Sequence, residues 1–292
     1  MICITGAGGT VGHEIVAQLE SAQASFRVAH HSMEKVKAAR ARGIEAVPID
    51  YNRPDTLDEA FEGCDRLFLL GPNALNQTQL ELNAVEAAKT FGIQHIVKLS
   101  VMGAGEESYS LARVHRPVER AIESSGLSWT FLRPNSFMQN LVTFMSQAIK
   151  ADSALYSASG EARISHVDVR DIAAVAVQAL TEANHGGNAY TLTGPEALTY
   201  GELTSDLSIV LGRTINHVSL SPAELKQGML AEGMSEELAD RMLDLERYIY
   251  EDQAGLISDD IRRVTGRDPR RFSDYLLEAA ATRIWDVDEV PK

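Results

Sequence analysis

The sequence has little cysteine and no long apolar run. Its two cysteines, Cys3 and Cys64, lie far apart in a chain of 292 residues. Neither a disulfide framework nor a cysteine metal site is therefore expected, and both thiols are interpreted as small core residues. No run approaches the roughly 18 apolar residues that a membrane-spanning helix needs, and no basic segment followed by an apolar stretch indicates a secretory signal. These absences favour a cytoplasmic protein without a membrane partner and without a bound metal.

Basic side chains are also scarce relative to acidic ones. Lys and Arg number 27 against 41 Asp and Glu, which gives a formal net charge of −14. A nucleic-acid surface needs clustered Lys and Arg to neutralise phosphates, so we expect no nucleic-acid partner. Hydrophobic residues make up 45% of the chain, an ordinary globular value, and the length allows one large core with a smaller lobe.

The first stretch that indicates a function is the glycine-rich turn in residues 1–12, MICITGAGGTVG. A short apolar run before it predicts a strand, and helical spacing of apolar residues after it predicts a helix. The spacing G-x-x-G-x-x-G is typical of a pyrophosphate-binding turn, because glycines let backbone N–H groups approach the phosphate and let the helix pack closely on the strand. The phosphate would lie at the positive end of the helix. The candidate cofactor-binding residues here are Gly6, Gly8, Gly9, Thr10, Val11 and Gly12.

Short apolar runs alternate with helical patterns through the first half of the chain. This rhythm is typical of right-handed crossovers that build a parallel sheet with helices on both faces. The sequence therefore predicts a Rossmann-type, doubly wound α/β fold with a dinucleotide lying across the carboxyl ends of the strands. The predicted strands are residues 2–4, 25–31, 43–49, 65–70, 94–99 and 128–134, and the predicted helices that follow the first are residues 34–42, 54–61, 80–91 and 111–124.

The second half of the chain has a looser pattern. We expect a helix over residues 135–149, an irregular hairpin region over 153–166, a strong helix over 167–180, and mostly helical structure from residue 221 onward. The prediction is a dinucleotide-binding domain of residues 1–134 plus 165–184. A smaller, mostly helical substrate lobe is expected to comprise residues 135–164 and 185–292.

The choice of cofactor is expected to depend on the end of the second predicted strand. An acid there would bind the ribose hydroxyls of NAD, but the sequence has His30-His31-Ser32, followed by Lys35 on the next helix. Donors and cations suit a 2′-phosphate, so NADP(H) is preferred and NAD(H) remains the alternative; two exposed histidines on a solvated loop are the simpler interpretation. Asp50 is placed to accept from an adenine amino group, although such an Asp is often only a turn cap. Residues Leu70, Gly71 and Pro72 would lie beneath the cofactor.

The nicotinamide end should lie near the fifth and sixth predicted strands, beside Ser100 and the helix that follows. A Tyr with a Lys four residues later is the usual carbonyl-reducing pair, since the cation lowers the pKa of the phenol. This chain has Tyr109 and Arg113 at that spacing. An Arg holds charge but titrates far too high to relay a proton.

Several longer motifs together resemble the NmrA-like group of atypical short-chain dehydrogenases/reductases, in a pattern close to triphenylmethane reductases and quinone oxidoreductases. These motifs are TGAGGTVG at residues 5–12, H-x-x-x-E at 115–119, SGLSWTFLRP at 125–134, NSFMQN at 135–140 and HVDVRDIA at 166–173. The resemblance spans nearly the whole chain. It implies that His115 stands where the superfamily has its Lys, and Leu111 where it has its Tyr.

The resemblance implies reduction without a phenol acid. His115 would contact the cofactor ribose or nicotinamide, or donate a proton near neutrality, and Tyr109 is the second catalytic candidate. Asn135, Arg113 and Ser100 are further cofactor-binding candidates. The residues expected to line a flat apolar substrate pocket between the two parts are Met102, Phe137, Met138, Phe144 and Trp285.

The leading hypothesis is an NAD(P)H-dependent oxidoreductase that reduces a quinone, dye or other conjugated aromatic acceptor by direct hydride transfer. The alternative is a non-catalytic NADP(H)-sensing regulatory protein of the NmrA type, for which the acidic residues 224–260 would be a contact surface or simply a solvated helical face. The expected partner is a small aromatic substrate, and the chain is expected to be a monomer or a homodimer.

Overall fold

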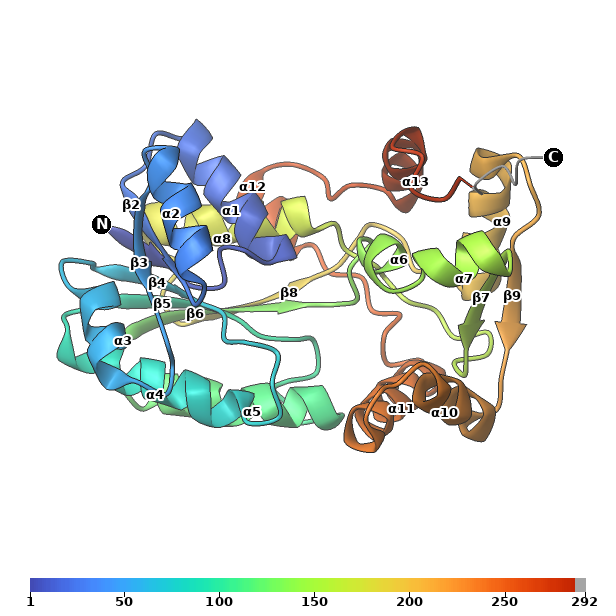
Figure 1. The fold of residues 1–292 in the computed structure, drawn as a ribbon, viewed down its shortest axis with the longest axis horizontal. Helices are drawn as coiled ribbons and strands as arrows, with labels where there is room; N and C mark the ends of the chain where they lie inside the picture. The colour runs from blue at the N-terminus through green and yellow to red at the C-terminus, as the bar shows by residue number, and fades with distance from the viewer. Residues whose placement is uncertain (287–292) are drawn as a thin grey trace.

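Parallel strands form the centre of the molecule in the computed structural model, which describes residues 1–286 (Figure 1). The main sheet has seven strands in the order β3-β2-β1-β4-β5-β6-β8. Crossing from β1 to β4 reverses the direction in which the strands are added, which is the switch point where doubly wound folds bind ligands. The strands are β1 Ile2–Ile4, β2 Phe26–His30, β3 Glu45–Pro48, β4 Arg66–Leu69, β5 His95–Leu99, β6 Ser128–Pro134 and β8 Asn188–Leu192.

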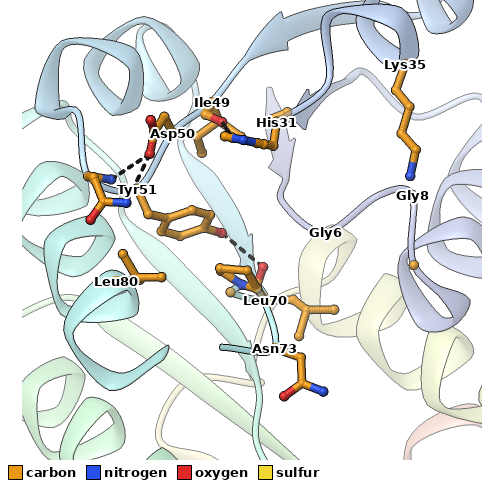
Figure 2. Close-up of a pocket in the computed structure, with 15 residues that line it drawn as sticks. Gly6, Gly8, His31, Lys35, Ile49, Asp50, Tyr51, Leu70, Asn73 and Leu80 are labelled. Atoms are coloured by element: carbon orange, nitrogen blue, oxygen red, sulfur yellow. Dashed lines mark hydrogen bonds between the residues drawn. The ribbon is translucent and has the colours of Figure 1, made fainter. Parts of the chain in front are cut away.

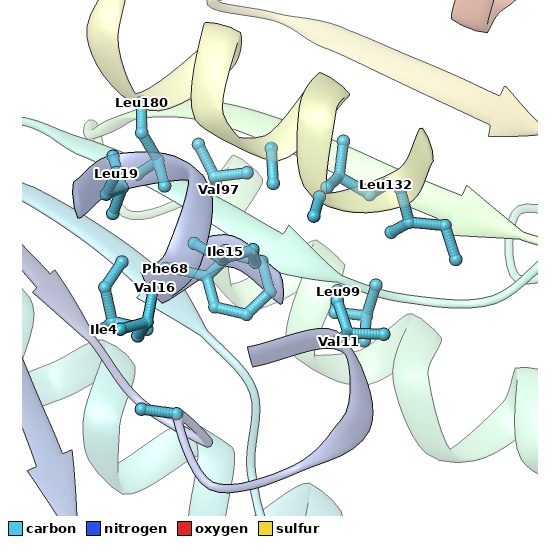
Figure 3. Close-up of a cluster of buried hydrophobic side chains, with 14 of the residues drawn as sticks. Ile4, Val11, Ile15, Val16, Leu19, Phe68, Val97, Leu99, Leu132 and Leu180 are labelled. Carbon is cyan, nitrogen blue, oxygen red and sulfur yellow. The ribbon is translucent and has the colours of Figure 1, made fainter. Parts of the chain in front are cut away.

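Helices cover both faces of this sheet. One face carries α1 Thr10–Ser21, α2 Met33–Ala41 and α8 Val169–Thr181, and the other carries α3 Pro54–Phe61, α4 Gln77–Thr90 and α5 Ser110–Glu123. Because successive side chains of a strand point to opposite faces, Ile4 joins the first core and Cys3 the second. Figure 3 shows the first core, where Phe68 and Leu132 of the sheet meet side chains of α1 and α8.

The sequence explains why α1 and α8 pack here. In α1, buried residues recur at helical spacing, and α8 is almost continuously apolar and is largely buried. Asp168 caps α8 by accepting a hydrogen bond from the Arg170 backbone N–H at 2.8 Å. The two helices lie side by side over the sheet and fix the start of α1, which is where the glycine turn ends.

A smaller lobe is built around a third core and a two-stranded parallel sheet of β7 Ala154–Ser157 and β9 Asn216–Ser219. Figure 1 shows it beside the carboxyl end of the main sheet. Its helices are α6 Asn140–Thr143, α7 Ser146–Ala151, α9 Tyr200–Leu211, α10 Pro222–Ala231, α11 Glu236–Tyr250 and α13 Phe272–Ala281, while α12 Asp260–Thr265 packs on α8.

The predicted Rossmann-type fold with a helical C-terminal part is confirmed, with three differences in the second half. The single helix expected over 135–149 is wrong: residues 135–139 are held by other segments, with the Met138 N–H donating to Val167 at 3.0 Å, and only two short helices follow. The expected hairpin over 153–166 is also wrong, because β7 pairs in parallel with the distant β9.

The third difference concerns the domain boundary. β8 was assigned to the substrate lobe, but it pairs with β6 along its whole length and completes the main sheet. Its inward side chains Tyr190 and Leu192 are buried there, so the chain returns to the sheet after α8 before it enters the lobe again. The rest of the predicted division stays a prediction, and its last part, residues 287–292, lies outside the described residues.

Two further findings concern residues 1–286. None of their helices has the length and apolar character needed to cross a bilayer. Likewise, no group of three or more His, Cys, Asp or Glu side chains in this range is arranged to hold a metal ion.

Candidate functional site

The glycine turn has the geometry that its spacing predicts. Gly6 has a positive φ of 65°, a conformation that favours glycine. A Cβ added to Gly12 would lie 2.2 Å from the Gly6 carbonyl oxygen, so only glycine lets α1 pack this closely on the turn. Gly9 precedes α1 and provides no side-chain cap. The first N–H groups of α1, including those of Thr10 and Val11, are therefore available to bind an anion.

This turn opens onto a cavity of about 580 Å³ across the carboxyl ends of the first four strands (Figure 2). Each strand contributes the residues that directly follow it. The lining consists of Gly6, Gly8, Gly9, Ala29, His31, Lys35, Ile49, Asp50, Tyr51, Asn52, Leu70, Gly71, Pro72, Asn73 and Leu80. The cavity thus brings together the glycines with His31, Lys35, Asp50 and the 70–72 segment, which the sequence analysis had proposed separately.

Positive charge lies at one end of the cavity. The Lys35 Nζ is 2.9 Å from where a Cβ on Gly8 would be, so the ammonium group lies against the glycine turn. His31 Nδ1 lies 3.3 Å from the Ile49 carbonyl oxygen, which holds the ring at the rim. No lining residue on β2 or on the turn after it is acidic, and this arrangement fits a phosphate on the adenine ribose better than bare ribose hydroxyls.

Two residues that sequence reasoning missed hold the turn after β4: Tyr51 lines the cavity, and Thr5 is fully buried. The Tyr51 hydroxyl donates to the Leu70 carbonyl at 3.0 Å, as Figure 2 shows. Thr5 Oγ1 accepts from the Leu70 N–H at 2.9 Å and donates to the Phe68 carbonyl at 2.9 Å. Together they fix the turn after β4 relative to the glycine turn. Thr5 directly follows the predicted strand 2–4, and Tyr51 lies two residues after the predicted strand 43–49, which was a usable signal.

Asp50 caps its own turn, the simpler interpretation raised from the sequence. Its Oδ1 accepts from the Asn52 N–H at 2.9 Å, so this oxygen is already engaged. Asp50 still lines the cavity, and its contact with an adenine amino group stays a prediction.

Gly71 connects the cavity wall to a buried ion pair that the sequence analysis also missed. The Gly71 N–H donates to Glu81 Oε1 at 2.9 Å, and a Cβ on Gly71 would lie 2.6 Å from Glu81 Cγ. Lys98 Nζ donates to Glu81 Oε2 at 2.6 Å, and both side chains are fully buried. Both residues occur in otherwise apolar patterns, 17 positions apart, which gave no sign of their pairing.

His115 lies at the other end of this ion pair. Its Nδ1 is 3.2 Å from Lys98 Nζ, and the residue is only 5% exposed. Burial, followed by the charge of Lys98, lowers the pKa of His115 to about 4. A pKa this low disfavours the expected proton donation by His115 near neutrality, and that role stays a prediction. A hydrogen-bonding contact with the cofactor stays a prediction.

Ser100 belongs to a second buried network on the same side of the sheet. Its hydroxyl donates to Glu119 Oε1 at 2.7 Å, and Arg133 binds both Glu119 oxygens at 3.0 and 2.8 Å. Burial opposes the charge of Glu119, but Arg133 and Ser100 outweigh it and lower the pKa of the carboxyl. The Ser100 hydroxyl is thus engaged within the protein.

Tyr109 and Arg113 lie where α5 meets α11. The Tyr109 ring stacks on Tyr248 with ring centroids 4.6 Å apart, and burial raises the pKa of its phenol. Arg113 pairs with Asp244 at 2.6 Å. The Arg113 guanidinium thus links α5 to α11 and does not line the cavity, and its predicted cofactor contact stays a prediction. Tyr109 stays a catalytic candidate only as a prediction.

The remaining candidate residues differ in how deeply they are buried. Met102 and Met138 are buried together in the lobe core, and Phe137 packs at the edge of the first sheet core. Phe144 is 76% exposed. The Asn135 amide donates to Ser165 and to the Ala254 carbonyl, both at 2.8 Å, so its donors are already used.

Trp285 is as deeply buried as Met138. It is 1% exposed and packs within the lobe core, where its carbonyl accepts from Arg213. The roles of all five substrate candidates stay predictions.

A glycine turn of this geometry, opening onto a cavity across the carboxyl ends of a parallel sheet, defines a dinucleotide-binding protein of the Rossmann type. More narrowly, the model of the NmrA-like family matches residues 1–276, and the chain belongs to this family. The predicted resemblance is thereby confirmed.

Relatives of known name cover almost the whole chain. The chain is 36% identical over 282 residues to the NAD(P)H azoreductase of Xenophilus azovorans, covering 96% of this chain and 98% of that protein. It is similar to the structure of an NADPH-dependent quinone oxidoreductase from Escherichia coli complexed with NADPH, with a TM-score of 0.89, 25% identity, and coverage of 96% and 100% of the two chains. It is also similar to the Citrobacter sp. triphenylmethane reductase complexed with NADP(H), with a TM-score of 0.85, 27% identity, and coverage of 96% and 99%.

Proposed function

We propose that the protein is an NAD(P)H-dependent reductase that transfers a hydride directly to a quinone, a dye or another conjugated aromatic acceptor. Its coarser part, the predicted class of NAD(P)H-dependent reductase, is confirmed by relatives named as an NAD(P)H azoreductase, a quinone oxidoreductase and a triphenylmethane reductase. The binding of NADP(H) is confirmed in the same way. The acceptor and the direct transfer are the finer proposal.

The observation that carries the proposal is the cavity itself. Its residues fit a dinucleotide: an uncapped helix start and glycines suit the pyrophosphate, and Lys35 suits a 2′-phosphate. When bound there, NADPH would supply the hydride. The chain's own part is to hold the cofactor between the glycine turn and the 70–72 segment, which Tyr51 and Thr5 keep in place.

The acidity of the candidate catalytic residues supports direct hydride transfer. Leu111 stands where the resemblance places the Tyr of the wider superfamily, His115 is neutral at pH 7, and burial raises the pKa of the Tyr109 phenol. None of these groups is a strong acid at neutral pH. A conjugated acceptor needs no acid in the hydride step, because its π-system spreads the added charge, and water can then supply the proton.

The test is a panel of quinones, azo dyes and triphenylmethane dyes with NADPH and with NADH, followed at the nicotinamide absorbance. We expect oxidation of NADPH with at least one acceptor class, and none above background with Gly9→Trp, which fills the turn. Cofactor binding without turnover of any acceptor would overturn the proposal and favour the regulatory alternative. That alternative is now the weaker one, because the named relatives are enzymes.

A further inference from the structure

Four groups form a continuous buried chain from the cofactor cavity to His115. The Gly71 N–H, which belongs to the cavity wall, donates to Glu81. Glu81 accepts from Lys98 at 2.6 Å, and Lys98 reaches His115 Nδ1 at 3.2 Å. Glu81 and Lys98 are 0% exposed and His115 is 5% exposed. Burying both charges of this ion pair costs desolvation free energy. We therefore expect its role to lie in the groups that it holds in place, the Gly71 N–H and His115.

The hydrogen-bond count decides the protonation of the ring. Lys98 has three N–H donors and no acceptor. One donates to Glu81 Oε2, one to the Leu99 carbonyl at 3.0 Å, and the third points to His115 Nδ1. Because Nδ1 must then accept, the proton of the neutral imidazole lies on Nε2.

We infer that Lys98 is a positioning residue that holds His115 as the neutral Nε2–H tautomer, and that Glu81 ties this arrangement to the Gly71 backbone in the cofactor wall. The purpose of this arrangement rests on the proposed function. In that function, His115 acts as a fixed hydrogen-bond donor toward the cofactor or the acceptor, and not as an acid. A donor of fixed tautomer keeps the same contact over the whole neutral pH range.

The charges around His115 predict what removal of Lys98 does. Glu81 on α4 and Glu119 on α5 both favour a protonated ring, while Lys98 on β5 opposes it. Glu119 is already paired with Arg133 and Arg116. In Lys98→Met, the Glu81 carboxylate therefore loses its cation and faces the ring, and a protonated His115 becomes its new partner.

The experiment is nitrogen NMR of ¹⁵N-histidine-labelled protein, with the His115 signals assigned by their loss in His115→Gln. We expect wild-type His115 to be in the Nε2–H form between pH 5.5 and 8, without titration. In Lys98→Met, its pKa should rise by at least one unit. The matched control is Lys89→Met, which removes an exposed lysine of α4 that is paired with Glu86, and it should leave the His115 signals unchanged.

A double variant covers the case in which Lys98→Met leaves too much unpaired charge to fold. In Lys98→Met/Glu81→Gln no buried carboxylate is uncompensated, and we expect His115 to stay neutral but to populate both tautomers. An Nδ1–H signal from His115 in the wild-type protein would overturn the inference. A Lys98→Met/Glu81→Gln variant in which His115 keeps the wild-type tautomer would also overturn it. The NMR needs no turnover, so a protein that reduces no acceptor would refute the proposed function and leave this result standing.

Discussion

Lys35 brings the positive charge that distinguishes the adenine end of the cavity. Its ammonium group lies against Gly8, and it lines the cavity together with His31. The sequence alone pointed to this residue, because donors and cations after the second predicted strand suit a 2′-phosphate. The position of the Lys35 ammonium group, by contrast, depends on how α2 packs against the rest of the fold.

Lys35→Met should weaken NADPH binding by about tenfold and NADH binding by less than about twofold. The reason is that only NADPH carries the 2′-phosphate, and a charge-assisted hydrogen bond at an accessible site contributes on the order of 1.5 kcal/mol. Calorimetric titration at constant ionic strength measures both affinities. Lys37→Met, on the same helix and outside the cavity lining, is the control. An equal loss for both cofactors would instead place Lys35 at the shared pyrophosphate.

The residues that sequence reasoning missed are buried and polar. Lys98 occurs within HIVKLS and Glu81 within LELNAV, and both patterns are typical of core elements. Their partnership exists only because β5 packs under α4, which brings together residues 17 positions apart. Spacing along the chain cannot reveal such a pair. The glycine turn could be predicted because all of its parts are local.

Among the elements, α11 is held to the start of α5 through one carboxylate. Asp244 accepts from the Ser110 N–H and hydroxyl, both at 2.6 Å, and pairs with Arg113 and Arg247. It thereby caps α5 from another part of the chain, since Tyr109 makes no side-chain cap. Burial opposes the charge, but the Ser110 and Arg247 hydrogen bonds dominate and lower the pKa of Asp244 to about 2.

Asp244→Asn should destabilise the protein by about 1–2 kcal/mol at pH 7, as the loss of a charged cap does. The folded pKa is below the unfolded value of about 3.9, so the contribution of Asp244 is complete above pH 4 and disappears as the pH falls toward 2. Urea unfolding and amide exchange in the first turn of α5 measure it. Asp240→Asn, one turn away and paired with the half-buried Lys226, should change little; equal effects would count against the cap.

Elements were predictable where local pattern and tertiary packing agree. The helix at 54–61 and the strand at 128–134 have the predicted bounds, since Pro54 fixes one start and Pro134 one end. The prediction failed at 135–149, where the Asn135 N–H is taken by Leu192 and the Met138 N–H by Val167. Those partners lie 57 and 29 positions later, so the apolar pattern was misread as helical.

At the scale of the whole molecule, several polar side chains are buried, and the histidines among these make stability depend on pH. Burial is the first cause that lowers the pKa of His95, His115 and His166, in each case to about 4. They come from β5, α5 and the segment before α8. Acidification therefore destabilises several parts of the structure at once.

The free energy of unfolding should fall as the pH drops from about 6.5 to about 4. In this window an unfolded histidine binds a proton and a folded one does not, so each costs on the order of 1 kcal/mol per pH unit. Carboxylates with lowered pKa, such as Glu119 and Asp168, add to this loss near the lower end of the range, because their unfolded pKa values are about 4. Chemical denaturation at half-unit pH steps gives the slope, which is proportional to the protons taken up on unfolding.

His166→Gln separates one contribution from the others. Among residues 1–286, Nδ1 of His166 has no hydrogen-bond partner, so the substitution loses no bond at that atom while it removes a group that is protonated only in the unfolded chain. The slope should then decrease by up to one proton near pH 5, whereas the same change at exposed His13 should leave it unaltered. If His166→Gln left the slope unchanged, His166 would have to be protonated in the folded protein, and its enclosure between Phe272 and Tyr200 would then need a hidden counter-charge.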